Sequence, residues 1–169
     1  PTHTGIPEDI KEWIWFLVLT GVHRSEVEDG VESVNSPIPH FKVYGKKTSG
    51  RYERIVPRII EMPDAEMPTV GRFKYHLKKL NRSQYDCRRT FAIWCMRARI
   101  NQNHTAAFMG HASSGLHSQT SLYQQEEVLN WITEDSRLLK DYLARELERQ
   151  DEEMPLPVVP AKGRSELGG

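Results

Sequence analysis

The sequence lacks the cysteine content of a disulfide-rich or zinc-binding protein. Its 169 residues include only two cysteines, Cys87 and Cys95, which lie eight residues apart on one predicted helix. Cysteines at that spacing cannot bond to each other, and no CxxC motif or paired Cys/His spacing indicates a zinc site. We therefore interpret both as small core residues of a cytoplasmic protein, with no metal and no cofactor.

Two further absences concern membranes and targeting. No apolar run is long enough to span a bilayer, so we expect a soluble protein without a membrane partner. The segment Pro1–Gly5 has neither the basic flank nor the apolar block of a signal peptide, and the chain does not begin with Met. We expect a fragment whose partner domain lies upstream. The length and the 38% hydrophobic content suit one domain with a real core.

The formal net charge is zero, but the charged residues are unevenly distributed along the chain. Residues 40–100 carry 15 Lys/Arg against 5 Asp/Glu, an excess of ten positive charges that the rest of the chain balances. The middle of the chain could therefore lie against a polyanion.

Hydrophobic periodicity predicts mainly helical structure with one small antiparallel sheet. An amphipathic helix is expected before Gly21, and Arg24 begins a second short helix. Residues 40–59 alternate around the turn KKTSGR and predict a β-hairpin, whose tip is either a solvated turn or a cationic contact to DNA. The apolar positions of the first helix and the hairpin are Ile10, Trp13, Ile14, Leu17, Val18, Phe41, Val43 and Ile55.

The second half predicts an irregular connection at 61–68, followed by a series of helices. The first carries a stripe at Val70, Phe73, Leu77 and Leu80, with basic residues that are either solvated or phosphate contacts. Helix is expected again over 124–132, and Thr133 is expected to cap a separate last helix. This last helix could fold back on its own domain or dock on a neighbour. Residues 154–169 are expected to be a disordered tail.

Residues 85–123 hold the densest set of reactive side chains. Asp86 is expected to cap a helix whose first turn contains Arg88. The planar guanidinium group of an arginine at this position is suited to binding phosphate oxygens. A short helix over Thr105–Met109 should end at Gly110 and present His111 from a turn. Tyr123 follows twelve residues later. Arginine, histidine and tyrosine in this order predict a phosphoryl-transfer site with a phenolic nucleophile.

Five segments in this order resemble the catalytic domain of the tyrosine recombinases, the phage-integrase family of DNA recombinases. Together they cover about residues 6–125. The resemblance implies that family's catalytic-core fold over residues 1–153, without its N-terminal core-binding domain. The five segments are TGVHRSEV, VYGKK with RIVPR, YDCRRTFA, FMGHASS and TSLYQQ.

The resemblance also implies roles for individual residues. Arg24, Arg88 and His111 would bind the scissile phosphate, and Tyr123 would attack it to form a 3′-phosphotyrosyl intermediate without a metal. A hairpin lysine, Lys46 or Lys47, would protonate the leaving 5′ oxygen. Tyr85 stands where the family usually has histidine, and its reference pKa of about 10 makes it a poor base. The spacing from His111 to Tyr123 is also longer than the family's, which implies a lengthened loop.

The implied partner is double-stranded DNA, with Lys47, Arg51 and Arg89 as further DNA-binding candidates. The full-length protein would act as a homotetramer on nucleoid or mobile-element DNA, and the fragment alone as a monomer or dimer. Three functions stay open at this point. They are a recombinase or integrase that works through a Holliday junction, a type IB topoisomerase-like or resolving enzyme, and a DNA-binding module without catalysis.

Overall fold

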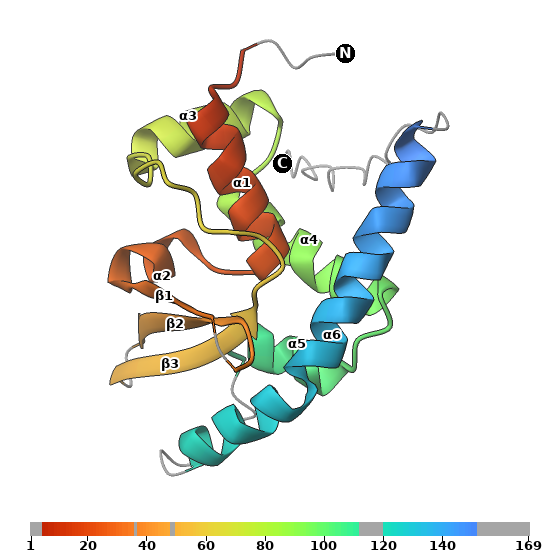
Figure 1. Cartoon of the computed structure of the whole chain (residues 1–169). Coiled ribbons are helices and arrows are strands. Elements are labelled where there is room, and N and C mark those ends of the chain that lie inside the picture. The colour runs from red at the N-terminus through yellow and green to blue at the C-terminus, as the bar shows by residue number, and fades with distance from the viewer. Residues whose placement is uncertain (1–4, 36, 48–49, 112–119, 152–169) are drawn as a thin grey trace, which may run out of the picture.

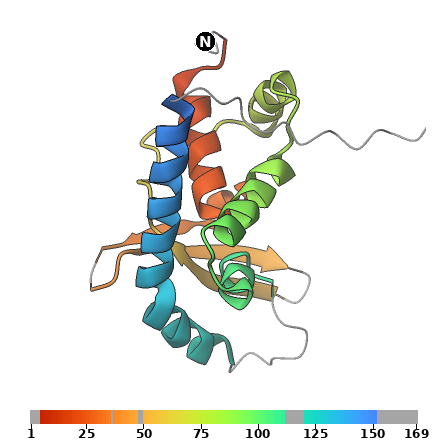
Figure 2. The same cartoon turned by 90° about the vertical axis from the view of Figure 1, so that its right-hand side faces the viewer.

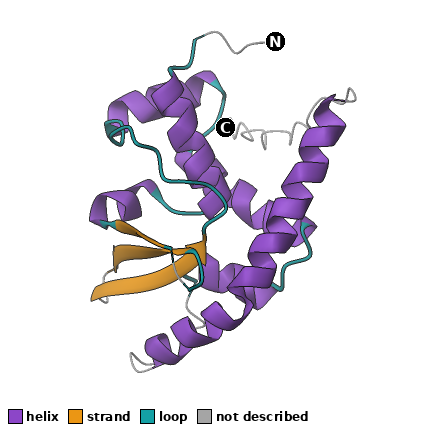
Figure 3. Ribbon diagram, in the orientation of Figure 1, coloured by secondary structure: helices purple, strands orange, loops and turns teal. Residues whose placement is uncertain are grey.

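The structure is a computed structural model that describes residues 5–35, 37–47, 50–111 and 120–151. In this part of the chain, helices pack with one antiparallel sheet of three strands that lies at one side of the molecule, which confirms the predicted class of a mainly helical protein with a small sheet (Figure 3). Side chains are not described for 47, 120–126, 150 and 151. The predicted tail and the loop that precedes the helix of Tyr123 lie outside the described residues.

Helices α1 (Glu8–Thr20) and α4 (Gln84–Arg97) pack against each other at the centre of the core. The predicted apolar stripe of α1 is confirmed, because Ile10, Trp13 and Leu17 are buried. The helix ends at Gly21, whose φ of 65° is left-handed as predicted. A Cβ atom at Gly21 would lie 2.4 Å from the Phe91 ring, so a glycine is required for this close approach of α1 to α4.

The sheet has the order β1 (Val31–Val34), β2 (His40–Lys47) and β3 (Gly50–Pro57). Strands β2 and β3 form the predicted hairpin, in which Lys46 pairs with Arg51. The short edge strand β1 was not predicted. Its sequence VESV is brief and has two exposed residues, so it carries little hydrophobic signal. Helix α2 (Arg24–Asp29) contacts β2 (Figure 1).

Helix α3 (Val70–Lys79) confirms the predicted stripe at Phe73 and Leu77, which are buried, whereas Val70 is exposed. The irregular connection at 61–68 is also confirmed. It is held on α1 by a hydrogen bond of 3.0 Å from Trp13 Nε1 to the carbonyl of Ala65.

Two predicted helix starts need correction. Ser83, not Asp86, caps α4, and the Asp86 side chain accepts a hydrogen bond from the Ser83 amide in a reciprocal capping box. Helix α5 (Gln102–Phe108) begins earlier than expected, because Asn101 caps it. In both cases a polar residue upstream caps the helix, so the helix begins earlier than the sequence predicted.

Helix α6 (Thr120–Asp151) is continuous, so the predicted break at Thr133 is wrong. Neither Gly nor Pro interrupts this segment, and the residues on both sides of Thr133 are packed: Ile132 and Asp135 are buried. The helix runs from beside β3 past the end of α4 (Figures 1 and 2). Its buried Leu139 and Tyr142 show that it folds back on its own domain.

Within the described ranges, we find no helix with both the length and the apolar character needed to cross a bilayer.

Candidate functional site

A buried carboxylate, Glu26, holds the centre of the site. Its side chain is 4% exposed and lies beside Arg54, with Arg54 Nη2 at 2.6 Å and Nε at 3.0 Å from its two oxygens. Tyr52 donates its hydroxyl to the same carboxylate. Burial alone would raise the pKa of Glu26, but the hydrogen bonds and charge of Arg54, with the Tyr52 bond, outweigh it and lower the pKa to about 2. Glu26 is therefore a fixed negative charge.

Helix α2 positions this carboxylate through its own N-terminus. His23 caps the helix, and Glu26, in the first turn, accepts a hydrogen bond of 2.7 Å from the His23 backbone amide. A carboxylate at a helix N-terminus is also stabilised by the helix dipole. The capping box thus presents Glu26 to the strand that carries Arg54.

Arg88 extends from the first turns of α4 to the same carboxylate. Its Nη1 lies 3.4 Å from Glu26 and 3.0 Å from the carbonyl of Gly21, and its Nη2 donates to the carbonyl of Met109. Burial lowers the pKa of Arg88, and the charge of Arg54 lowers it further, while Glu26 opposes both. Arg88 therefore joins the end of α1 to the end of α5.

The turn before His111 is built on this arginine pair. Gly110 has a φ of 62°, as predicted, and the His111 amide donates to the carbonyl of Ala106 at 2.9 Å to close the end of α5. A Cβ atom at Gly110 would lie 2.8 Å from Cδ of Arg54. The structure thus brings Arg88 and the exposed His111 to one turn, with Arg54 packed beneath it.

Arg24 follows a different course. Its side chain is 6% exposed, lies 2.5 Å from Glu28 on its own helix, and donates at 2.6 Å to the carbonyl of Pro68 in the connection before α3. Arg88 has a different set of partners, which are Gly21, Glu26 and Met109. Arg24 and Arg88 therefore share no partner among the described residues, and their convergence with His111 on one anion stays a prediction.

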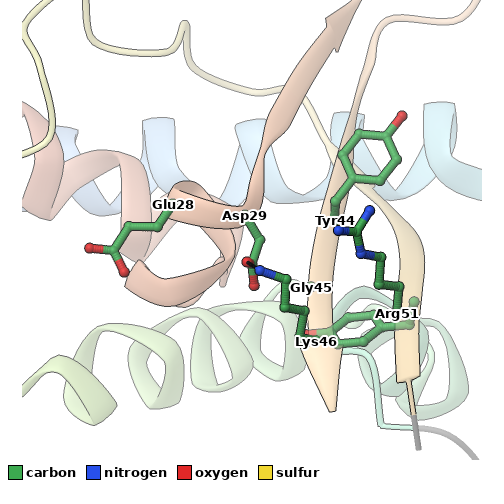
Figure 4. Close-up of a pocket in the computed structure, with 7 residues that line it drawn as sticks. Glu28, Asp29, Tyr44, Gly45, Lys46 and Arg51 are labelled. Carbon is green, nitrogen blue, oxygen red and sulfur yellow. Dashed lines mark ion pairs between the residues drawn. The ribbon is translucent and has the colours of Figure 1, made fainter.

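Lys46, one of the two candidate hairpin lysines, lines a cavity of about 220 Å³ between α2 and the strands. Lys46 Nζ forms an ion pair of 2.8 Å with Asp29, the last residue of α2. Figure 4 shows Lys46 reaching toward Asp29, with Arg51 beside Tyr44. The cavity is lined by Glu28, Asp29, Tyr44, Gly45, Lys46, Arg51 and Tyr52.

The structure says less about the other candidates, which are Tyr85, Arg89, Lys47 and Tyr123. Tyr85 is 69% exposed in the first turn of α4, and Arg89 is exposed on the same helix. The backbone of Lys47 pairs with that of Gly50, and Tyr123 falls in the first turn of α6. The side chains of Lys47 and Tyr123 lie outside the described residues.

The sequence interpretation missed Glu26, Arg54 and Tyr52. Arg54 did carry a signal, because it is a charged residue directly before the buried pair Ile55 and Val56. A charged side chain in such a place needs a buried partner. The identity of that partner depends on a contact between residues 28 positions apart, which no local pattern reveals.

Comparisons with protein-family models, with curated proteins and with solved structures give no match. In the described part of the chain, we also find no group of three or more His, Cys, Asp or Glu side chains that could hold a metal ion. The site is best defined by its charge, with two arginines sharing one buried carboxylate beside a histidine-bearing turn.

Proposed function

We propose that this chain is the catalytic domain of a site-specific DNA recombinase or integrase of the tyrosine-recombinase type, which cleaves and rejoins DNA through a covalent tyrosine. The observation that carries the proposal is the bond from Arg88 to the carbonyl of Met109, two residues before His111. It places a largely buried guanidinium and an imidazole-bearing turn together, as a phosphate site of this kind requires. The order of the sequence motifs supports the same function.

Arg88 keeps donors for a ligand. A guanidinium has five N–H groups. Contacts to Gly21, Glu26 and Met109 engage Nη1 twice and Nη2 once. The remaining N–H on Nη2 and the one on Nε could bind phosphate oxygens. The two positive charges of the buried Arg54 and the half-buried Arg88 exceed the single negative charge of Glu26, so an incoming anion would balance the local charge.

In the proposed reaction, the phenol of Tyr123 gives its proton to water, and its oxygen bonds to phosphorus as the bond to the 5′ oxygen breaks. Arg88 and His111 would stabilise the charge on the phosphate oxygens. Lys46 or Lys47 would give its proton to the departing 5′ oxygen, and Lys46 would first exchange Asp29 for that oxygen. Arg24 would bind the phosphate through N–H groups that Glu28 and Pro68 leave unused, among them the buried Nε, which has no hydrogen-bond partner among the described residues. Tyr85 would donate a hydrogen bond rather than act as a base.

The proposal is tested with a nicked suicide duplex, which traps the covalent intermediate. We expect an adduct from the parent chain, none from Tyr123→Phe, and an undiminished adduct from Tyr75→Phe, which changes an exposed tyrosine on α3. An adduct that survives Tyr123→Phe contradicts the proposed nucleophile. An adduct that never yields junctions between two sites would instead favour a type IB topoisomerase-like or resolving activity.

A second candidate, a DNA-binding module without catalysis, is favoured by the engaged state of two predicted catalytic cations. Arg24 and Lys46 both have carboxylate partners, Glu28 and Asp29. In this case the parent chain would bind duplex DNA yet form no adduct, and Tyr123→Phe would bind equally well. For either function, we propose duplex DNA as the partner, with a homotetramer on DNA for the full-length recombinase.

A further inference from the structure

A second cationic site lies at the opposite end of α4 from Arg88. A cavity of about 530 Å³ opens between the end of α4 and the second half of α6. Four of its lining residues are arginines, and one is acidic, which gives an excess of three positive charges. The residues that matter here are Arg97, Arg99, Arg145, Arg149, Tyr142 and Glu146.

The arginines differ in how they are engaged. Arg97 hydrogen-bonds to Tyr142, which raises the pKa of Arg97, and Arg149 lies 3.0 Å from Glu146. Among the residues that the structure describes, no hydrogen bond or ion pair engages the side chain of Arg99 or Arg145. Two exposed guanidinium groups with unused donors therefore flank the cavity.

The backbone at Arg99 adds a second, independent observation. Arg99 has a φ of 62°, and the amide of Ile100 donates to the carbonyl of Cys95 at 3.0 Å, which completes the end of α4. Glycine or asparagine is the usual residue at this position, since the left-handed conformation costs other residues about 1 kcal/mol or more. Arg99 therefore lies at the cavity in a left-handed backbone conformation that arginine disfavours.

We propose that this cavity binds the phosphodiester backbone of duplex DNA, away from the phosphate that would be cleaved. Planar guanidinium forks match phosphate oxygens, whereas the buried ring of Tyr142 offers no platform for stacking a base. Arg97 lies nine residues after Arg88, which places the two on opposite sides of α4 and about 14 Å apart along its axis. The cavity therefore contacts a different phosphate. The choice of DNA as the ligand rests on the proposed function.

The test measures binding of a labelled, unnicked duplex by fluorescence anisotropy over about 50 to 200 mM salt. All proteins carry Tyr123→Phe, so that no covalent step contributes. Arg99→Gly removes the charge and also relieves the backbone, so a loss of binding cannot come from unfolding. We expect it to weaken binding about threefold to tenfold and to reduce the salt slope by about one. Arg99→Gly with Arg145→Ala should reduce the slope by about two.

Two controls make the outcome specific. Arg99→Lys keeps the charge and should retain most of the binding. Arg137→Ala removes the same charge elsewhere on α6, where Arg137 is paired with Glu134 and Asp141, and should change the salt slope little. If Arg137→Ala and Arg99→Gly lose equal DNA affinity, the effect comes from the net charge of the protein and the proposed site is overturned. An unchanged salt slope in the double variant would also overturn the site.

The same variants separate this inference from the proposed function. If the parent chain forms no adduct but the double variant still loses about two units of salt slope, the catalytic proposal fails and the DNA site stands. If the parent chain forms the adduct but the double variant keeps the parent's salt slope, the catalytic proposal stands and the DNA site at this cavity fails. If an acidic peptide, polyglutamate, loses affinity in the double variant while DNA does not, the cavity serves an acidic protein segment and this proposal is overturned.

Discussion

The guanidinium groups of Arg54 and Arg88 share one oxygen of a buried carboxylate, at 2.6 and 3.4 Å from Oε2 of Glu26. Arg54 comes from β3 and Arg88 from α4, so Glu26 on α2 joins three elements that are distant in the sequence. Both arginines also donate to backbone carbonyls at the end of α5, Arg54 to Phe108 and Arg88 to Met109. Any change in this carboxylate should therefore affect both the stability of the domain and the candidate site.

Replacing Glu26 with glutamine keeps the shape of the side chain but removes the charge. Because two guanidinium groups would lose the one carboxylate that pairs with them among the described residues, we expect the free energy of unfolding to fall by about 3 to 5 kcal/mol. Urea unfolding would measure this loss. Glu127→Gln removes an exposed carboxylate from α6 and should change the stability by less than about 0.5 kcal/mol. Similar losses in both variants would contradict a special role for Glu26.

The same carboxylate predicts how stability depends on pH. Its pKa in the folded protein is about 2, below the ordinary value of 4.5. Its contribution is therefore fully present above pH 4.5 and is lost as the pH falls through about 2. We expect the free energy of unfolding to decrease across this window, by about 3 kcal/mol from Glu26 at most. Unfolding curves of the parent chain and of Glu26→Gln should converge toward acid pH, and parallel curves would contradict the prediction.

The ion pair between Asp29 and Lys46 predicts an effect on rate rather than on stability. Lys46 is largely exposed, so the pair should contribute at most about 1 kcal/mol to folding. If Lys46 donates the proton to the leaving oxygen, Asp29→Asn frees it, and the adduct should form a few times faster on the suicide duplex. Asp64→Asn in the exposed connection before α3 is the matched control and should leave the rate unchanged. A slower rate in Asp29→Asn would show that Asp29 positions the lysine instead.

Local patterns predicted most of the fold. The spacing of Ile10, Trp13 and Leu17 fixes one face of α1, and alternation around a turn fixes the β2–β3 hairpin, because both signals lie within a few neighbouring residues. The resemblance to the integrase core stays a prediction. The break expected at Thr133 shows the limit of local reasoning, because a possible capping residue continues a helix when both of its sides are packed.

The site was less accessible from the sequence, since it depends on where long side chains turn. Arg24 and Arg88 both lie near helix N-termini, yet one turns to Glu28 and the other to Glu26. Nothing in the motif TGVHRSEV distinguishes these directions. The burial of Arg54 is likewise decided by Gly110, whose missing side chain leaves room for the arginine stem.

Arg24→Lys separates a structural role from a catalytic one. Lysine keeps the charge near Glu28 but cannot reproduce both contacts of the guanidinium, so we expect a loss of about 1 to 3 kcal/mol in unfolding free energy. If Arg24 serves only to join Glu28 and Pro68, the adduct should form at nearly the parent rate at temperatures where the variant is folded. A hundredfold slower adduct in folded protein would mean that the Arg24 guanidinium also binds the phosphate.

Gly110 offers the sharpest test of the turn that carries His111, because a matched glycine exists in α3. At Gly110 the φ of 62° is unfavourable for alanine, and a Cβ atom would lie 2.8 Å from Cδ of Arg54. Gly110→Ala should therefore destabilise the domain by about 1 to 3 kcal/mol and slow adduct formation, since both Arg54 and the His111 turn must shift. Gly71→Ala meets nothing within 4 Å and lies in a helix, so it should be neutral or stabilise by up to about 1 kcal/mol. Thermal unfolding with the suicide-duplex assay gives both readouts, and a Gly110→Ala variant that matches Gly71→Ala in both would show that the turn tolerates a side chain and does not position His111.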